Sequence, residues 1–174
     1  MLLAAYAVAI FLSAALLFMV QPLAGKILLP LLGGSPAVWN TCMVFFQAVL
    51  LAGYGYSHVS TKMLRPKHAA VVHAVLLALA AATLPIPVLV GEPGDEDPVR
   101  WLLKTLLLTA GLPFFVVSTT GPLLQSWFAR TDHPSAKDPY FLYAASNAGS
   151  LLGLIAYPAL LEPLLGRSGQ SRTW

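Results

Sequence analysis

The stretch QPLAGKILLPLLGGSPAVWNT, residues 21–41, places polar and helix-breaking residues between two long apolar runs. The run before it, residues 2–20, is apolar except for Ser13, and the run after it, residues 42–56, is interrupted mainly by Gln47. Runs of this length and composition need an apolar surrounding. The stretch therefore predicts the joint of a hydrophobic helical hairpin.

The composition extends this prediction to the whole chain. Of the 174 residues, 57% are hydrophobic and 10% are charged, and the mean hydropathy is +0.74. Soluble domains carry about 25% charged residues, so this chain lacks the polar surface to cover a globule in water. The formal net charge of +3 is scattered at the ends of apolar runs, which argues against nucleic acid as a partner. The expected partner is the lipid bilayer.

A membrane-spanning helix needs about 20 mostly apolar residues, and five segments of the sequence meet that requirement. They predict an all-α integral membrane bundle that forms a single transmembrane domain, residues 1–174. The expected helices cover residues 2–32, 36–61, 69–90, 98–128 and 139–165. The third ends at Leu84 instead if the step Pro85-Ile86-Pro87 is not counted as an irregular exit toward the interface. Proline removes a backbone donor and bends helices, so Pro22 and Pro30 predict a kinked first helix and Pro113 and Pro122 a kinked fourth.

Three pairs of a capping residue and proline mark expected helix starts: Ser35-Pro36, Asp97-Pro98 and Asp138-Pro139. The side-chain oxygen of the first residue can accept from the free backbone N–H groups, and proline at the first helical position loses nothing. The last nine residues, 166–174, are expected to form a short polar tail.

The N-terminal run is interpreted as a retained helix. Residues 1–20 have no basic n-region and no small-residue cleavage site of the kind that signal peptides carry. The basic residues near the helix ends divide equally between the two sides, but Lys62, Arg65 and Lys67 form a dense cluster without a compensating acid. By the positive-inside rule, this cluster and the N-terminus are expected to be cytoplasmic, in a bacterial inner membrane.

Strongly polar residues at or near membrane depth are the candidate site. If several converge, they form a polar cavity of the kind that a transporter needs. Alternatively, Lys26 and Glu162 lie near helix ends and extend to the interface, while the amides tie helices together. The candidate residues are Gln21, Lys26, Asn40, Gln47, Gln125, Asn147 and Glu162.

A stripe of small residues marks the last expected helix. Ala145, Gly149 and Gly153 recur at intervals of four, a spacing that lets another helix approach closely. The stripe predicts either packing against a helix of this chain or contact with a partner subunit.

Enzymatic machinery is not visible in the sequence. Gly33 and Gly34 lie between two apolar helices rather than in a strand-to-helix turn that would bind a dinucleotide, and no nucleophile, base and orienting acid are grouped. Cys42 is the only cysteine and the four histidines lack ligand spacing. We therefore expect no enzyme activity, no cofactor and no metal.

Several motifs resemble a known family. FMVQPLAGK (18–26), LPLLGGSPAVWNT (29–41), YAASNAGSLL (143–152) and the pair Glu162-Pro163 are similar to the membrane region of bacterial spermidine-synthase-like proteins. These proteins are described as fusions of a major-facilitator-like part to an aminopropyltransferase-like domain. The resemblance implies a transporter-like helical bundle. The chain stops at Trp174, before the region that would correspond to the synthase-like domain, so no transferase activity is implied.

These observations support three hypotheses about function. The first is a non-enzymatic accessory or scaffolding subunit of a larger membrane complex, with other membrane protein subunits as partners. The second is a carrier for a small molecule, of polyamine-like or other cationic type. The third is a membrane anchor for a separately encoded synthase-like enzyme.

Overall fold

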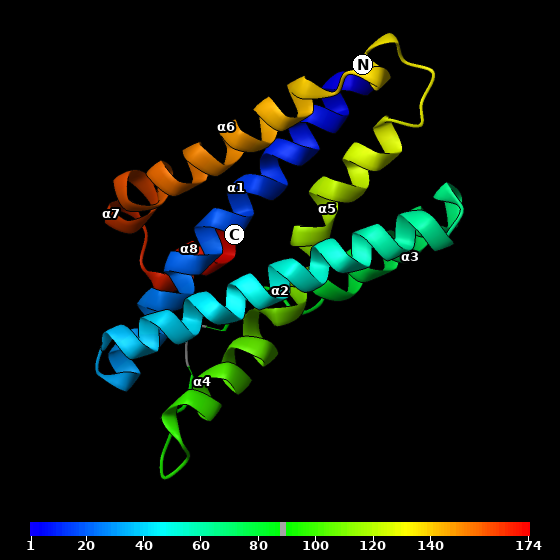
Figure 1. The fold of residues 1–174 in the computed structure, drawn as a ribbon. Helices are drawn as coiled ribbons and strands as arrows, with labels where there is room; N and C mark the ends of the chain where they lie inside the picture. Colours follow the sequence, from blue (N-terminus) through cyan, green and yellow to red (C-terminus); the bar gives the residue numbers. More distant parts are fainter. Residues whose placement is uncertain (88–89) are drawn as a thin grey trace.

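The computed structural model describes residues 1–87 and 90–174, and within these ranges it contains helices and no β-strand (Figure 1). The predicted all-α helical bundle is confirmed. The α-helices are α1 (Leu2–Leu28), α2 (Pro36–Met63), α3 (Pro66–Ala81), α4 (Pro98–Leu106), α5 (Leu112–Phe128), α6 (Tyr140–Ala156), α7 (Glu162–Leu164) and α8 (Arg167–Thr173). Two 3₁₀ segments, η1 (Leu29–Leu32) and η3 (Pro134–Lys137), and two π segments, η2 (Leu107–Gly111) and η4 (Tyr157–Leu161), complete the described elements.

Four of the five expected spans are continuous helical segments long and apolar enough to cross a membrane: Leu2–Leu32, Pro36–Met63, Pro98–Phe128 and Tyr140–Leu164. The expected helix at 69–90, of which residues 88–89 lie outside the described part of the chain, is the exception, because α3 has 16 residues and ends at Ala81. At about 1.5 Å per residue it is about 24 Å long, shorter than a hydrocarbon core of about 30 Å. Pro85 and Pro87 cannot donate to a continuing helix and disfavour helical geometry in the residues before them.

The ends of the helices gather at two ends of the molecule. The N-terminus, the α2–α3 turn and the α5–α6 loop lie at one end, and the α1–α2 joint and the start of α4 lie at the other (Figure 1). The chain after α3 therefore leads to the opposite end although α3 itself stops short. Ile86 in that connection is buried in the main apolar core.

Proline changes the helix type differently in the first and fourth spans. Regular α-helix in the first span continues through Pro22 to Leu28 and then tightens to the 3₁₀ segment that contains Pro30. Gly33 ends it at φ 77°, a left-handed conformation that glycine adopts without strain. In the fourth span the π segment η2 precedes Pro113, whose missing N–H prevents a regular hydrogen bond to the preceding turn.

Two of the three predicted caps are confirmed. The Ser35 side chain accepts from the Val38 N–H at 3.4 Å, and Asp97 accepts from the Arg100 N–H at 2.9 Å. The prediction for Asp138 is wrong. Pro139 occupies the N-cap position of α6 without a side-chain bond, and its carbonyl accepts from the Leu142 N–H, so the helix begins one residue later than a cap at Asp138 requires.

Helices α1 and α6 pack with their backbones in contact. A Cβ atom placed on Gly149 would overlap the carbonyl oxygen of Phe11, and one placed on Gly153 would lie 2.6 Å from the carbonyl oxygen of Ala15. Ala145 is half-buried. The two glycines of the predicted stripe therefore serve packing within this chain.

The last residues are not a solvated tail. They form α8, and the C-terminus lies beside the middle of α1 (Figure 1). The Tyr157 hydroxyl donates to the Gln170 side-chain oxygen at 2.8 Å, and the Trp174 indole N–H donates to the carbonyl oxygen of Leu16 at 2.7 Å. Ser171 donates to the carbonyl oxygen of Ile86. Polar groups can enter the bundle here because each of these side chains finds an acceptor or a donor.

Candidate functional site

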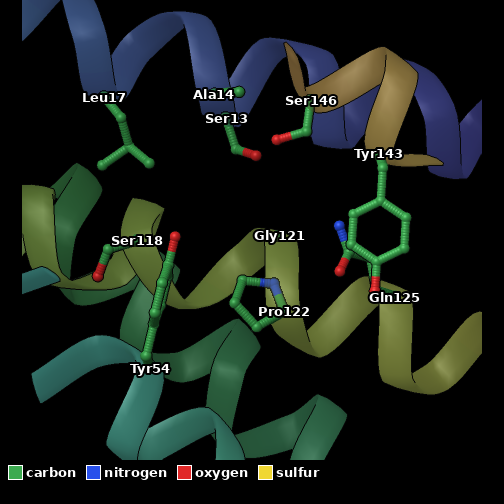
Figure 2. Close-up of a pocket in the computed structure, with 10 residues that line it drawn as sticks. All are labelled: Ser13, Ala14, Leu17, Tyr54, Ser118, Gly121, Pro122, Gln125, Tyr143 and Ser146. Carbon is green, nitrogen blue, oxygen red and sulfur yellow. The ribbon is translucent and has the colours of Figure 1, made fainter. Parts of the chain in front are cut away.

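A polar cavity of about 270 Å³ lies where α1, α2, α5 and α6 meet (Figure 2). Four helices contribute to its wall, and six of the ten lining side chains carry a hydroxyl or amide group. The lining residues are Ser13, Ala14, Leu17, Tyr54, Ser118, Gly121, Pro122, Gln125, Tyr143 and Ser146.

The cavity lies between two apolar clusters. Along α1, Ile10 belongs to the smaller cluster and Val20 to the larger one, with the cavity residues 13–17 between them. Along α5, Phe114 belongs to the larger cluster and Phe128 to the smaller one, with the cavity residues 118–125 between them. The cavity therefore lies near the middle of the first span but closer to the α5–α6 loop on the span Pro98–Phe128, with buried apolar side chains on both sides of it along α1 and α5.

The α5 wall combines side-chain and backbone groups. Ser118, Gly121, Pro122 and Gln125 recur at i, i+3, i+4 and i+7, a spacing that places them on one helix face. Pro122 has no N–H, so the carbonyl of Ser118 loses its regular helical donor. In a membrane such a carbonyl needs another donor, and here it belongs to a residue of the cavity wall.

The serine hydroxyls of the wall keep free acceptor capacity. Ser13 donates to the carbonyl oxygen of Ile10 at 2.9 Å and Ser118 to that of Phe115 at 2.7 Å, which leaves the oxygen lone pairs available. Figure 2 shows the hydroxyls of Ser13 and Ser146 turned toward one another. The hydroxyls of α1 and α6 therefore meet at the cavity wall, whereas the Ser118 hydroxyl is turned toward Gly53 of α2.

Aromatic hydroxyls complete the wall. Figure 2 shows Tyr143 reaching from α6 toward Gln125 on α5 and Tyr54 rising into the same space from α2. None of the ten lining residues carries a formal charge at neutral pH. The site can form many hydrogen bonds but has no counter-ion for a charged ligand.

The candidate residues from the sequence are distributed differently. Within the described part of the chain, Gln125 lines the cavity, whereas Gln21 is half-buried elsewhere on α1, and Asn40, Gln47 and Asn147 are exposed. Lys26 and Glu162 form an ion pair with 3.2 Å between Nζ and Oε1, and their side chains are 31% and 49% exposed. The structure thus brings Lys26 and Glu162 together, but it does not gather the amides around them.

Some cavity residues left a signal in the sequence. Ser13 is the single polar residue of the run 2–20, and Ser118 and Gln125 share a helix face. Tyr54 and Tyr143 left none, because a tyrosine in an apolar helix is equally expected at the interface or against a neighbouring helix. Only the arrangement of four helices shows that they meet.

No family model, no curated protein and no solved structure matches this chain. The structure defines the class of the chain as an all-α bundle with four helices long and apolar enough to span a membrane, and with a partly open polar cavity between them. The resemblance to the membrane region of spermidine-synthase-like proteins stays a prediction.

Proposed function

We propose that this chain is the solute-binding part of a membrane carrier for a small, polar, uncharged molecule. The observation that carries the proposal is the cavity between the spanning helices, lined by five hydroxyls and one carboxamide and bounded along α1 and α5 by apolar clusters. In carriers, interrupted helices supply free backbone groups to the substrate site. The proline-interrupted wall of α5 provides such a group in the carbonyl of Ser118.

The charge of the lining favours an uncharged solute over a polyamine. A polyamine would bring two or more ammonium groups to a wall that has no carboxylate. Removing an unpaired charge from water costs several kcal/mol, and hydroxyl and amide groups compensate this only in part. A volume of about 270 Å³ is also below the usual range for drug-sized ligands, about 300–1,000 Å³.

The test is solute flux into proteoliposomes, with glycerol and urea as uncharged probes and putrescine as the cationic probe. We expect the protein to accelerate entry of an uncharged probe and Gln125→Leu to reduce that flux about tenfold, because losing one buried hydrogen bond costs about 1–3 kcal/mol. Gln47→Leu is the matched control, since Gln47 is an exposed amide on α2. Flux of putrescine alone would support the polyamine hypothesis, and no flux of any probe would overturn the carrier proposal.

A second candidate function, assembly with other membrane subunits, is favoured by two exposed amides. Gln47 and Asn147 lie within the spans Pro36–Met63 and Tyr140–Leu164 and are exposed on the bundle surface. An amide facing lipid lacks hydrogen-bond partners, which the polar groups of another helix can supply. The small-residue stripe no longer supports this function, because its glycines pack against α1.

Purification in mild detergent distinguishes the two functions. If the exposed amides contact a subunit, Gln47→Leu with Asn147→Leu removes a stoichiometric partner and leaves solute flux unchanged. Gln125→Leu should reduce solute flux and leave the partner bound. A chain that purifies alone before and after the double substitution would exclude the subunit function. The hypothesis of a membrane anchor for a synthase-like enzyme has no structural observation of its own and stays a prediction.

We also propose that the end carrying Lys62, Arg65 and Lys67 faces the cytoplasm of a bacterial inner membrane. The proposal rests on the excess of uncompensated positive charge in this short turn. Single cysteines at Lys67 and at Gly94 in a Cys42→Ala background provide the test in intact cells. Labelling of the cysteine at position 67 by a membrane-impermeant maleimide would show that this end faces away from the cytoplasm and would overturn the proposed orientation.

A further inference from the structure

His73 on α3 is buried next to the cavity wall. Its side chain is 4% exposed, and its two ring nitrogens each face a threonine hydroxyl of α5. Nδ1 lies 3.4 Å from the Thr119 oxygen and Nε2 lies 3.2 Å from the Thr120 oxygen. Trp127 packs against the ring at 6.1 Å between centroids. The imidazole is thus held between two hydroxyls with little room to rotate.

The threonine protons have an acceptor of their own. Thr119 donates to the carbonyl oxygen of Val116 at 2.7 Å, and Thr120 donates to the same oxygen at 3.0 Å. In this arrangement both hydroxyl oxygens offer lone pairs to the ring. A protonated imidazole has two N–H donors, whereas a neutral one has one donor and one acceptor. The protonated ring can donate to both hydroxyls, whereas the neutral ring donates to one and accepts from the other, so a change of protonation requires one threonine hydroxyl to rotate.

Charged groups do not compete for this position. Helix α5 contains no charged residue, and neither ion pair within residues 1–87 and 90–174 includes His73. On α2, Tyr54 lines the cavity and Tyr56 packs against Phe115. Four further titratable side chains of α2 and α3 are exposed to the surroundings of the bundle. They are His58, Lys62, Lys67 and His68. The two threonine hydroxyls make the polar contacts of the ring, and they must offset the cost of burying a charged imidazole.

The histidine contacts are continuous with the cavity wall. Ser118, which lines the cavity, directly precedes Thr119 and Thr120, and Gly121 and Pro122, which also line it, directly follow. The Ser57 hydroxyl on α2 donates to the carbonyl oxygen of Gly53 at 2.9 Å and lies 3.3 Å from the carbonyl oxygen of Thr119. Because Pro122 interrupts regular hydrogen bonding in this turn, a change in the threonine hydroxyls can alter the wall without unwinding a complete helix.

We propose that His73 is a proton-binding site coupled to the polar cavity, so that protonation changes access to the cavity. The proton comes from the aqueous phase and adds to the lone pair of the unprotonated ring nitrogen, and no bond of the protein breaks. The coupling deepens the carrier function proposed above and rests on it for its biological role, because a proton bound at membrane depth can drive a solute.

The first test is ¹⁵N NMR of the full chain labelled at histidine in lipid nanodiscs. His73→Gln, whose amide retains a donor and an acceptor, identifies the His73 signal. We expect that signal to change from neutral imidazole to imidazolium with one midpoint between about pH 5 and pH 6.5, because burial disfavours the charged ring and so lowers its pKa. Thr120→Ser should retain the midpoint and Thr120→Val should lower it. A His73 signal that stays neutral throughout this interval would overturn the proposal.

The second test measures access to the cavity without any solute. A single reporter, Ser146→Cys or Gly121→Cys in a Cys42→Ala background, is modified with N-ethylmaleimide at several pH values. At each pH the rate is divided by that of the same chain carrying His73→Gln, which removes the pH dependence of the thiol itself. We expect this ratio to change at least about fivefold over the interval in which His73 titrates. A constant ratio with either reporter would exclude coupling. A chain that passes both tests but carries no solute would contradict the carrier function alone.

Discussion

The two helix pairs that enclose the cavity are built differently. At the α1–α6 interface, Gly149 and Gly153 meet backbone atoms of Phe11 and Ala15. At the α2–α5 interface, Gly53 meets the side chains of Ser118 and Thr119. Backbone cannot yield without moving a helix, whereas a hydroxyl can rotate. The comparison shows that one side of the cavity is fixed and the other can adjust.

The chemistry of the two interfaces follows the same division. The α2–α5 side contains buried hydroxyls, the ring of His73 and the proline-interrupted turn of α5. The α1–α6 side is joined by close approach of two helices and by the Lys26–Glu162 ion pair at its end. In the carrier function proposed above, the α1–α6 side would hold the bundle together and the α2–α5 side would respond to the solute.

The largest effect on the free energy of unfolding is expected at the α1–α6 interface, the fixed side. In Gly149→Ala the added Cβ overlaps the Phe11 carbonyl, so α1 and α6 must separate, and we expect a loss of about 2–3 kcal/mol in the free energy of unfolding. Unfolding by sodium dodecyl sulfate in mixed micelles, followed by circular dichroism, measures it. Gly55→Ala is the control, since a Cβ there meets nothing within 4 Å. Equal stability of the two variants would remove the basis for calling this side fixed.

A smaller effect on stability is expected at the equivalent glycine of the adjustable side. In Gly53→Ala the nearest atom is the Ser118 hydroxyl, which can rotate, so we expect a loss of about 1 kcal/mol. Because Ser118 lines the cavity, the same substitution should also change maleimide labelling at Ser146→Cys. If Gly53→Ala lowers the free energy of unfolding more than Gly149→Ala does, the α2–α5 interface is the more rigid of the two.

The smallest effect is expected for the ion pair between α1 and α7. Glu162→Gln should lower the free energy of unfolding by less than about 1 kcal/mol, because both side chains are partly exposed and such pairs contribute little. The same micelle titration measures it, and Glu96→Gln, which removes the more open pair with Lys104 at 3.8 Å, is the control. A loss as large as that of Gly149→Ala would show that the pair lies in an apolar surrounding and belongs to the fixed side.

The fold was more predictable than the site. Long apolar runs, the joint at 21–41 and the caps at Ser35 and Asp97 act over a few neighbouring residues, so the sequence displays them directly. The end of α3 at Ala81 was missed, although Pro85 and Pro87 indicated it, because hydropathy alone continues to Val90. The helix at 167–173 was missed because its partners, Leu16 and Ile86, are distant in the sequence.

The sequence by itself determined that the chain is a membrane protein and that it is helical. Both properties depend on local composition and on backbone groups that must be satisfied within each span. Only the tertiary structure decided which polar residues share a cavity. Gln125 points into it while Gln47 and Asn147 remain outside, because the face of a helix that turns inward depends on which neighbour it packs against. The glycine contacts of α1 with α6 and of α2 with α5 set those faces.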